Sequence, residues 1–291
     1  MTSGRFNLNG EASDSEQNSA STSSAAATTA TNTTGSVASV GSTVSGGTTE
    51  VRENEKIRTF VFTSRGSSSS LQRSDRTHQS AAEVHLEELE IKIPELLQSG
   101  YSFYTWTCAP ILAWFLWERR HSLVGKRILE LGAGTALPGI LAAKCGAQVI
   151  LSDNCILPKS LNHIRRSCAV NNLQPGQDIE VIGLSWGLLL NSVFSLGPLD
   201  LIIAADCFYD PSVFEDIIVT VSFLLERNPS AKFIVTYQER SADWSIEALL
   251  KKWKLCALQI NSDDIGKASG VDLLEILGGH TIHLIEISRE V

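Results

Sequence analysis

The order of apolar and polar residues predicts strands that alternate with helices over most of the chain after Gly100. Helical periodicity spans residues 105–121, 137–145, 158–172, 212–227 and 241–253. Short apolar runs typical of buried strands lie at 127–131, 147–153, 179–186, 200–206, 231–237, 254–260 and 280–287. This alternation predicts an α/β fold with a mostly parallel sheet of seven strands and helices on both faces. The last run has no predicted helix before it, so we expect it to join the sheet antiparallel.

Two segments before this alternation predict an N-terminal β-hairpin. Residues 57–64 (IRTFVFTS) have the composition of a strand, and residues 84–97 (VHLEELEIKIPELL) alternate well enough to pair with it. The serine-rich segment 64–80 lies between them and is predicted to be a mobile loop.

The first 55 residues have a different composition. No residue from Gln17 to Thr49 is charged, and Ser, Thr, Ala and Gly dominate. Such a sequence cannot bury enough apolar surface to offset the entropy lost on ordering. We therefore predict a disordered low-complexity tail over 1–55 and one folded domain over 56–291.

Composition and charge exclude several classes of protein. The net charge of -8 argues against specific nucleic-acid binding, which depends on clustered basic side chains, and suits a basic partner. No apolar run reaches the roughly 18 residues needed to span a bilayer, so we expect no membrane insertion. The first residues lack an apolar signal segment, which argues against secretion. Six cysteines without a CxxC pair predict reduced core thiols in the cytosol or nucleus, and no metal site.

The turn after the strand 127–131 carries the first sign of chemistry. In such sheets ligands bind beyond the carboxyl ends of the strands, where the strand order reverses. Gly132 and Gly134 allow positive φ angles and a close approach of ligand to backbone. A dinucleotide fingerprint would have a third glycine three residues later, where this chain has Leu137, and its next glycine is Gly139. A nicotinamide cofactor is therefore disfavoured.

Two carboxylates flank this turn. Glu130 precedes the glycines, and Asp153 ends the next strand, where a carboxylate can accept both hydroxyls of a ribose. A nucleoside without phosphates fits this pattern, and S-adenosylmethionine is such a ligand. The alternative is an ordinary tight turn, with Asp153 only capping the helix that follows.

These features together resemble a known family. The pattern ExGxGxxxxG (130–139), Asp153, LSWG (184–187), DCFY (206–209) and YTWTCAPILAWFLW (104–117) are similar to the seven-strand protein methyltransferases of the methyltransferase-like family. The resemblance covers about residues 84–291. It implies a Rossmann-like class I methyltransferase fold, S-adenosylmethionine as cofactor, and methyl transfer to a basic side chain of a protein.

The resemblance also implies roles for particular residues. Asp206 and Tyr209 are the expected catalytic pair beside the transferred methyl group. A carboxylate can hold a Lys or Arg nitrogen by a charge-assisted bond, and Tyr209 can favour a cation through its ring. The alternative is that Asp206 caps the helix predicted near Pro211.

The expected cofactor-binding residues are Trp106, Glu130, Gly132, Gly134, Asp153, Ser185, Trp186 and Ala205. Trp106 and Trp186 could equally belong to the core, and Ser185 stands where the family usually has an acidic residue. Glu130 is expected to orient the loop backbone or to contact the methionine amine. His280 and His283, expected on one face of an edge strand, are predicted to be structural.

The target nitrogen is less defined than the cofactor. The family at large favours lysine, whereas the stretches 137–154 and 237–253 are similar to a subgroup associated with arginine methylation of histones. The two glutamates on one loop of dedicated arginine methyltransferases are absent from this sequence. Asp206, Asp210 and Glu215 could form a substitute acidic mouth.

The sequence leaves three hypotheses open. The first is a protein methyltransferase acting on a histone arginine, ahead of a lysine in a non-histone protein, and located in the nucleus and cytoplasm. The second is a non-catalytic interaction module that has kept the fold. The third is a small-molecule methyltransferase or an oxidoreductase.

Overall fold

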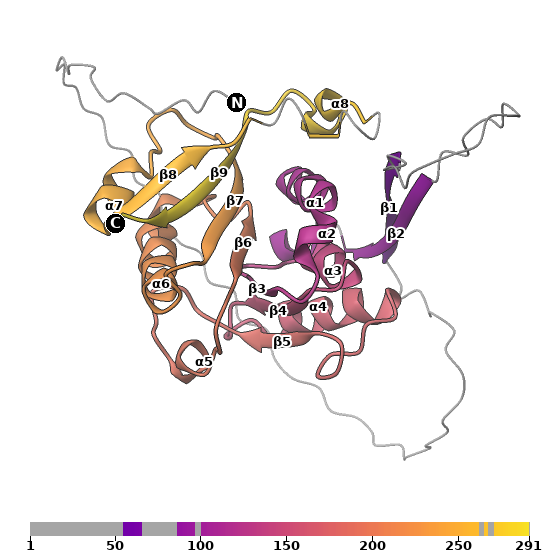
Figure 1. The fold of residues 1–291 in the computed structure, drawn as a ribbon, viewed down its shortest axis with the longest axis horizontal. Helices are drawn as coiled ribbons and strands as arrows, with labels where there is room; N and C mark the ends of the chain where they lie inside the picture. Colours follow the sequence, from indigo (N-terminus) through magenta and orange to yellow (C-terminus); the bar gives the residue numbers. More distant parts are fainter. Residues whose placement is uncertain (1–54, 66–85, 97–99, 262–264, 267–270, 291) are drawn as a thin grey trace, which may run out of the picture. The chain divides into compact units, whose positions relative to one another are not determined.

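The computed structural model describes residues 55–65, 86–96, 100–261, 265–266 and 271–290 (Figure 1). The predicted tail over 1–55 lies outside the described residues except for Glu55. The predicted mobile loop lies outside them from residue 66 on.

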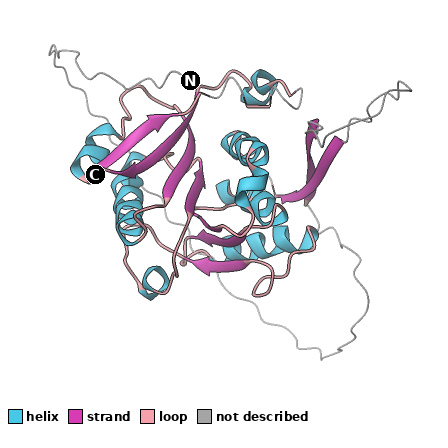
Figure 2. Cartoon of the chain, viewed as in Figure 1, coloured by secondary structure: helices cyan, strands magenta, loops and turns pink. Residues whose placement is uncertain are grey.

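A seven-stranded sheet forms the centre of the fold, with the strand order β5-β4-β3-β6-β7-β9-β8 (Figure 1), and its strands are the magenta arrows of Figure 2. Neighbouring strands from β5 to β7 pair in parallel, whereas β9 is antiparallel to both β7 and β8. The predicted seven strands and the antiparallel last strand are therefore confirmed. Their bounds are β3 Arg127–Glu130, β4 Gln148–Asp153, β5 Glu180–Gly183, β6 Leu201–Ala205, β7 Lys232–Gln238, β8 Leu255–Gln259 and β9 Ile282–Arg289.

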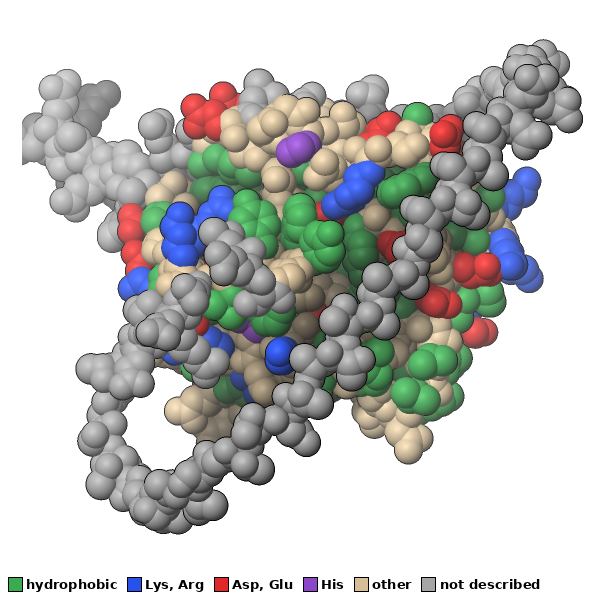
Figure 3. Space-filling view, turned by 180° about the vertical axis from the view of Figure 1, so that it is seen from behind, with side chains coloured by type: hydrophobic (Ala, Val, Ile, Leu, Met, Phe, Trp, Pro, Cys, Tyr) green, Lys and Arg blue, Asp and Glu red, His purple; other side chains and the backbone are tan. Residues whose placement is uncertain are grey.

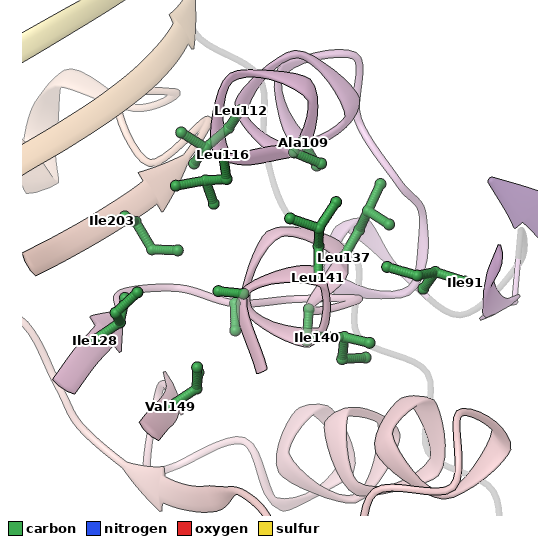
Figure 4. Packing of buried hydrophobic residues seen from close by; sticks show 14 of the residues in the cluster. Ile91, Ala109, Leu112, Leu116, Ile128, Leu137, Ile140, Leu141, Val149 and Ile203 are labelled. Atoms are coloured by element: carbon green, nitrogen blue, oxygen red, sulfur yellow. The ribbon is translucent and has the colours of Figure 1, made fainter. Parts of the chain in front are cut away.

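One face of the sheet is covered by α1 (Cys108–Glu118), α3 (Leu137–Lys144) and α4 (Pro158–Val170). Ile128, Val149 and Ile203 come from three neighbouring strands and are buried in the same apolar cluster as these helices (Figure 4). Because successive strand residues point to opposite faces, the residues beside them face the other layer. Both faces are apolar, as the continuous strand runs predicted.

The opposite face is covered by α5 (Asn191–Phe194), α6 (Phe214–Arg227) and α7 (Glu247–Lys252). Leu129, Ile150 and Ile202 lie in this second cluster, and each is adjacent in its strand to a residue of the first cluster. Helix α6 buries one apolar side, and acidic residues in its first turn complement the helix dipole.

The predicted hairpin is present as β1 (Lys56–Arg65) paired antiparallel with β2 (Leu86–Glu95). It packs on the first helical layer, because the ring of Phe62 lies 4.9 Å from that of Trp114 in α1. The side chain of Asn171, at the end of α4, bonds the backbone N–H and C=O of Lys92 at 2.9 and 2.7 Å. The Asn171 amide thus satisfies both backbone groups of Lys92, as a neighbouring strand would, and ties β2 to α4.

Several local predictions differ from the structure. Helix α7 occupies only the second half of the predicted segment 241–253, and the short helices α2 (Arg120–Leu123), α5 and α8 (Leu273–Leu277) were not predicted. Helix α8 precedes β9, so the expectation that no helix stands before the last strand is wrong. Helices of one turn are too short to show a 3.6-residue period in the sequence.

The expectation for the two histidines is also corrected. Strand β9 lies inside the sheet between β7 and β8, so His283 is not on an edge strand, and His280 precedes the strand. His283 Nε2 lies 2.9 Å from Glu239 Oε2, and His280 Nδ1 lies 3.0 Å from Gln238 Nε2.

All six cysteines are free thiols in the structure. Cys155 and Cys256 are exposed, so the prediction of core thiols is wrong for these two. Within the described ranges, no three His, Cys, Asp or Glu side chains are grouped to hold a metal ion. The described helices also include none long and apolar enough to cross a membrane. On the face drawn in Figure 3, basic, acidic and apolar side chains lie interspersed.

Candidate active site

A pocket of about 590 Å³ opens at the carboxyl ends of β3, β4 and β6. Strand order reverses between β3 and β6, because the chain adds β4 and β5 on one side and β7 on the other. The volume is that of a site for a small molecule or cofactor. Eight of the ten predicted site residues line this pocket: Trp106, Gly132, Gly134, Asp153, Trp186, Ala205, Asp206 and Tyr209.

The floor of the pocket is the turn between β3 and α3. Gly132 and Gly134 have φ angles of 61° and 52°, which glycine adopts without steric cost. A Cβ at position 132 would lie 2.8 Å from Trp186 Cζ2, closer than a carbon contact allows. The bare backbone at this position therefore leaves room for the Trp186 ring, which lines the pocket with it.

The carboxylate of Asp153, at the end of β4, is fixed in position by two backbone N–H donors. Its Oδ2 accepts from Gly134 N at 3.0 Å, and its Oδ1 accepts from Asn154 N at 2.7 Å. Burial raises the pKa of Asp153. Each oxygen keeps a second acceptor position, so two ribose hydroxyls can be received. Helix α4 begins later, after Leu157, so the alternative of Asp153 as its cap is wrong.

Glu130 is buried beneath the floor and does not line the pocket, so a contact with the methionine amine stays a prediction. Its Oε2 accepts from the backbone N–H of Gly139 at 3.0 Å, in the first turn of α3. Burial raises the pKa of Glu130 to about 8. Orientation of the loop and helix backbone, one of its two predicted roles, is what this geometry provides.

Gly139 serves close packing of α3 on the sheet. A Cβ at this position would overlap Leu151 Cδ2 and Glu130 Oε2. In a dinucleotide fingerprint the glycine that allows close packing of helix on strand would be at position 137. In this chain Gly139 allows it.

Ser185 does not line the pocket, and its role in cofactor binding stays a prediction. Its Oγ lies 3.0 Å from Cys155 Sγ and 3.2 Å from Asn154 Oδ1, which turns it toward the loop after β4. The neighbouring Trp186 lines the pocket and also packs on the second apolar cluster.

Asp206 follows β6 at the other end of the pocket. Its side chain is 5% exposed, and its backbone has a left-handed φ of 61°, which is uncommon for a residue with a Cβ. The Asp206 N–H donates to Thr236 O at 2.7 Å, which anchors it to β7. The cap of the 3₁₀ turn at Pro211–Val213 is Asp210, which accepts from Ser212 N, so the alternative of Asp206 as a cap is wrong.

The carboxylate of Asp206 is paired with Arg240, which lies in the loop after β7. Arg240 Nη2 is 2.7 Å from Oδ2, and Nη1 is 2.9 Å from Oδ1. Hydrogen bonding to Asp206 raises the pKa of Arg240. This pairing was not predicted from the sequence.

Aromatic side chains surround the mouth of the pocket. Tyr209 is 50% exposed, Trp106 is 37% exposed and Trp244 is 38% exposed. Trp106 Nε1 donates to Tyr101 O at 3.0 Å, which fixes its ring at the surface. The alternative of Trp106 as a core residue is therefore wrong.

Sequence reasoning missed part of the lining and misplaced one acid. Glu215 Oε1 accepts from Lys252 Nζ and Trp253 Nε1, outside the pocket, so the predicted acidic mouth is reduced to Asp206 and Asp210. A possible signal for Arg240 was the need of a buried Asp206 for a nearby cation. The lining residues that were not predicted are Tyr101, Ser102, Tyr104, Ala109, Ala133, Thr135, Pro211, Arg240 and Trp244.

The Rossmann-like sheet and the glycine-floored pocket are those of an S-adenosylmethionine-dependent methyltransferase. The floor, the open acceptor positions of Asp153 and the volume all fit that cofactor. The chain belongs to the family whose sequence model is described as lysine methyltransferase, and which matches residues 85–249. The family predicted from the motifs is thereby confirmed.

Relatives agree with this assignment. The chain is 46% identical to the histone-arginine methyltransferase METTL23 of Xenopus laevis, over 70% of this chain and 86% of that protein. It is 48% identical to the protein of the same name from Homo sapiens, over 64% and 96%. It is 34% identical to the protein N-lysine methyltransferase METTL21A of Danio rerio, over 51% and 67%. The resemblance to a subgroup of the family, indicated by residues 137–154 and 237–253, is thereby confirmed, and the METTL23 proteins are that subgroup.

Proposed function

We propose that this enzyme methylates an arginine side chain of a histone. Two observations support the proposal. Relatives at 46–48% identity carry the name histone-arginine methyltransferase. Asp206, at the pocket end opposite Asp153, holds the guanidinium of Arg240 through both carboxylate oxygens, so its geometry suits a guanidinium ligand.

The cofactor would be held at the β3–β4 end. Asp153 accepts the ribose hydroxyls, and the backbone at Gly132 and Gly134 admits the nucleoside without steric conflict. Trp106, Trp186 and Ala205 line the remaining walls beside it. When bound, S-adenosylmethionine supplies an electrophilic methyl group on a sulfonium.

The protein's own contribution to the reaction is orientation and charge. A nitrogen must approach the methyl carbon in line with the departing sulfur, and holding it in that geometry gives much of the rate. Asp206 accepts a hydrogen bond from the target nitrogen and aims its lone pair. Tyr209 walls the pocket and favours a cationic side chain through its ring.

The charges of the pocket suit a cationic target. Its charged lining residues are Asp153, Asp206, Asp210 and Arg240, which gives three carboxylates and one guanidinium. The net charge of these side chains is therefore -2. A bound sulfonium balances one of the two negative charges and leaves one. One cationic side chain is therefore accommodated without leaving an unbalanced positive charge.

Lysine in a non-histone protein is the second candidate target. The description of the family and the 34% identical lysine methyltransferase favour it. An ammonium would use Asp206 as a point contact, with no need for two parallel bonds.

The proposal is tested by transfer of a labelled methyl group to core histones, followed by mass spectrometry of the labelled peptide. We expect label on arginine with the parent enzyme and its near loss with Asp206→Asn. Label only on lysine would favour the second candidate. Equal labelling by the variant would overturn the role of Asp206.

We also propose that the enzyme is present in both nucleus and cytoplasm, and a histone target requires the nuclear part. Imaging of the tagged full-length chain tests this. Its exclusion from the nucleus would contradict a histone target and leave a cytosolic protein as the substrate.

A further inference from the structure

The carboxylate proposed to hold the target is already bound by a guanidinium of the same chain. Arg240 makes two parallel N–H···O bonds, of 2.7 and 2.9 Å, to the two oxygens of Asp206. This is the fork-like arrangement that a target arginine would form with a carboxylate. Arg240 and such a target therefore require the same atoms.

The acceptor positions of Asp206 leave no room for both guanidinium groups in this arrangement. Each carboxylate oxygen has about two acceptor positions. Oδ1 receives both Arg240 Nη1 and the backbone N–H of Gln238, the latter at 3.3 Å. At most one position remains, on Oδ2, so a second guanidinium cannot bind both oxygens while Arg240 remains.

Asp206 does not need Arg240 to stay in place. Its backbone N–H donates to Thr236 O at 2.7 Å, and its Oδ1 accepts from Gln238 N. Both partners belong to β7, so the sheet itself fixes the position of this residue. Arg240 supplies a countercharge, without which a buried carboxylate is unfavourable.

Arg240 is placed where it can move. It lies in the loop between β7 and α7, and its side chain is 24% exposed at the lining of the pocket. Its Nη1 also donates to Gln238 O, in a long bond of 3.3 Å. The side chain can thus turn toward solvent without disturbing a strand or helix.

We infer that Arg240 is an exchangeable counter-ion of Asp206 and a specificity-determining residue, which a target arginine replaces by forming the same two bonds. The inference rests on the proposed function. For a guanidinium the exchange is balanced, since two charge-assisted bonds are lost and two are gained. A lysine ammonium lacks the planar fork and regains less. Arg240 thereby favours arginine over lysine at the cost of some affinity.

The test compares the parent with Arg240→Gln, using a histone peptide and the same peptide with lysine at the target position. Without its competitor, the competent fraction of Asp206 rises, so KM for the arginine peptide is expected to fall about three- to tenfold. The kcat with the arginine peptide should change less than about twofold, because no contact made only in the transition state is lost. The ratio of kcat/KM for arginine over lysine should fall about tenfold.

A binding measurement and two controls complete the test. Calorimetric titration of the arginine peptide should give a dissociation constant that falls in parallel with KM. Arg165→Gln removes an exposed arginine outside the pocket and should leave KM unchanged. Arg240→Lys keeps the charge without the fork and should give an intermediate KM.

Several outcomes would overturn the inference. An unchanged or raised KM in Arg240→Gln, or a tenfold fall in kcat with constant KM, would make Arg240 a positioning residue. Failure of both Arg240 variants to fold would make it structural. These results are separable from failure of the proposed function, which is judged from the parent enzyme and Asp206→Asn in the same assay.

Discussion

The two ends of the pocket are built in different ways. At the cofactor end, the glycine turn and Asp153 belong to one unit of strand, helix and strand, and Asp153 bonds Gly134 only 19 residues away. At the target end, Asp206 pairs with Arg240, which is 34 residues further on and beyond another helix and strand. The first end is local in sequence, whereas the second is assembled by the fold.

The two ends of the pocket therefore differ in how many substitutions they tolerate. The cofactor end rests on backbone N–H groups and on positive φ angles, which few substitutions preserve. The target end rests on exchangeable side chains in loops after β6 and β7. A single scaffold can therefore keep its cofactor while its target changes, as the arginine and lysine names among its relatives indicate.

The largest effect is expected for Gly132→Val at the cofactor end. The new side chain would overlap the Trp186 ring and would force a β-branched residue into a left-handed backbone. We expect S-adenosylmethionine binding to fall by at least about a hundredfold in calorimetry, from strain and overlap of about 3 kcal/mol or more.

Gly125→Val is the matched control for Gly132→Val. Gly125 also has a positive φ, of 72°, but a Cβ there would have no neighbour within 4 Å. It should lower the melting temperature through backbone strain and leave the affinity for the cofactor unchanged. Equal loss of affinity in both variants would show that strain alone, and not the space above Gly132, limits binding.

A smaller effect, confined to the target end, is expected for Asp206→Asn. The amide keeps the shape of the carboxylate but loses its charge, so kcat should fall about a hundredfold. Affinity for S-adenosylmethionine, measured by calorimetry, should fall much less than kcat, because the bonds that hold Asp153 do not involve Asp206. Loss of cofactor binding together with kcat would contradict the division of the pocket into two ends.

The same division explains how much of the molecule could be predicted from its sequence. The strands and the hairpin follow from short apolar or alternating runs, the helices α4 and α6 from helical periodicity, and the buried helices α1 and α3 from apolar segments of two turns or more. The one-turn helices α5 and α8 carry too few residues for a period. Residues 241–246, which precede α7, fit the helical pattern of the predicted segment in sequence. In the structure they form turns and irregular backbone.

For the site, local motifs could be predicted and distant pairs could not. Gly132, Gly134 and Asp153 lie in one motif, whose spacing alone indicates a ligand. Arg240 has no motif of its own, and it reaches Asp206 only because β6 and β7 are neighbours in the sheet. Its pairing depends on tertiary structure, which a single sequence does not show.

A pH-dependent effect is expected for Glu130, which supports the cofactor end from below. Its pKa in the folded protein, about 8, lies above its ordinary value of 4.5. The proton it retains contributes stability that is fully present below about pH 4.5 and is lost as the pH rises through about 8. Denaturant titrations of the parent should therefore show stability falling by up to about 1.4 kcal/mol per pH unit between these values.

Glu130→Gln tests this effect. The amide is neutral at all pH values and can still accept from Gly139 N. Its stability should depend less on pH than that of the parent between pH 5 and 8. An equal slope in both proteins would show that another group causes the dependence.

The smallest effect is expected for Asp210→Asn, at the outer edge of the target end. Asp210 is exposed, and the hydrogen bond from Ser212 N lowers its pKa, so it carries its charge at neutral pH. Asparagine still caps the 3₁₀ turn, which preserves the local backbone. Only a long-range attraction for a basic peptide is lost, so KM should rise about two- to threefold at low salt and return to the parent value near 0.5 M salt.

Asp200→Asn is the control for this prediction. Asp200 is an exposed acid beside the opposite end of β6, and its substitution should leave KM unchanged. A rise in KM that persists at high salt would mean that Asp210 touches the target directly, which would extend the target end from buried Asp206 to its rim.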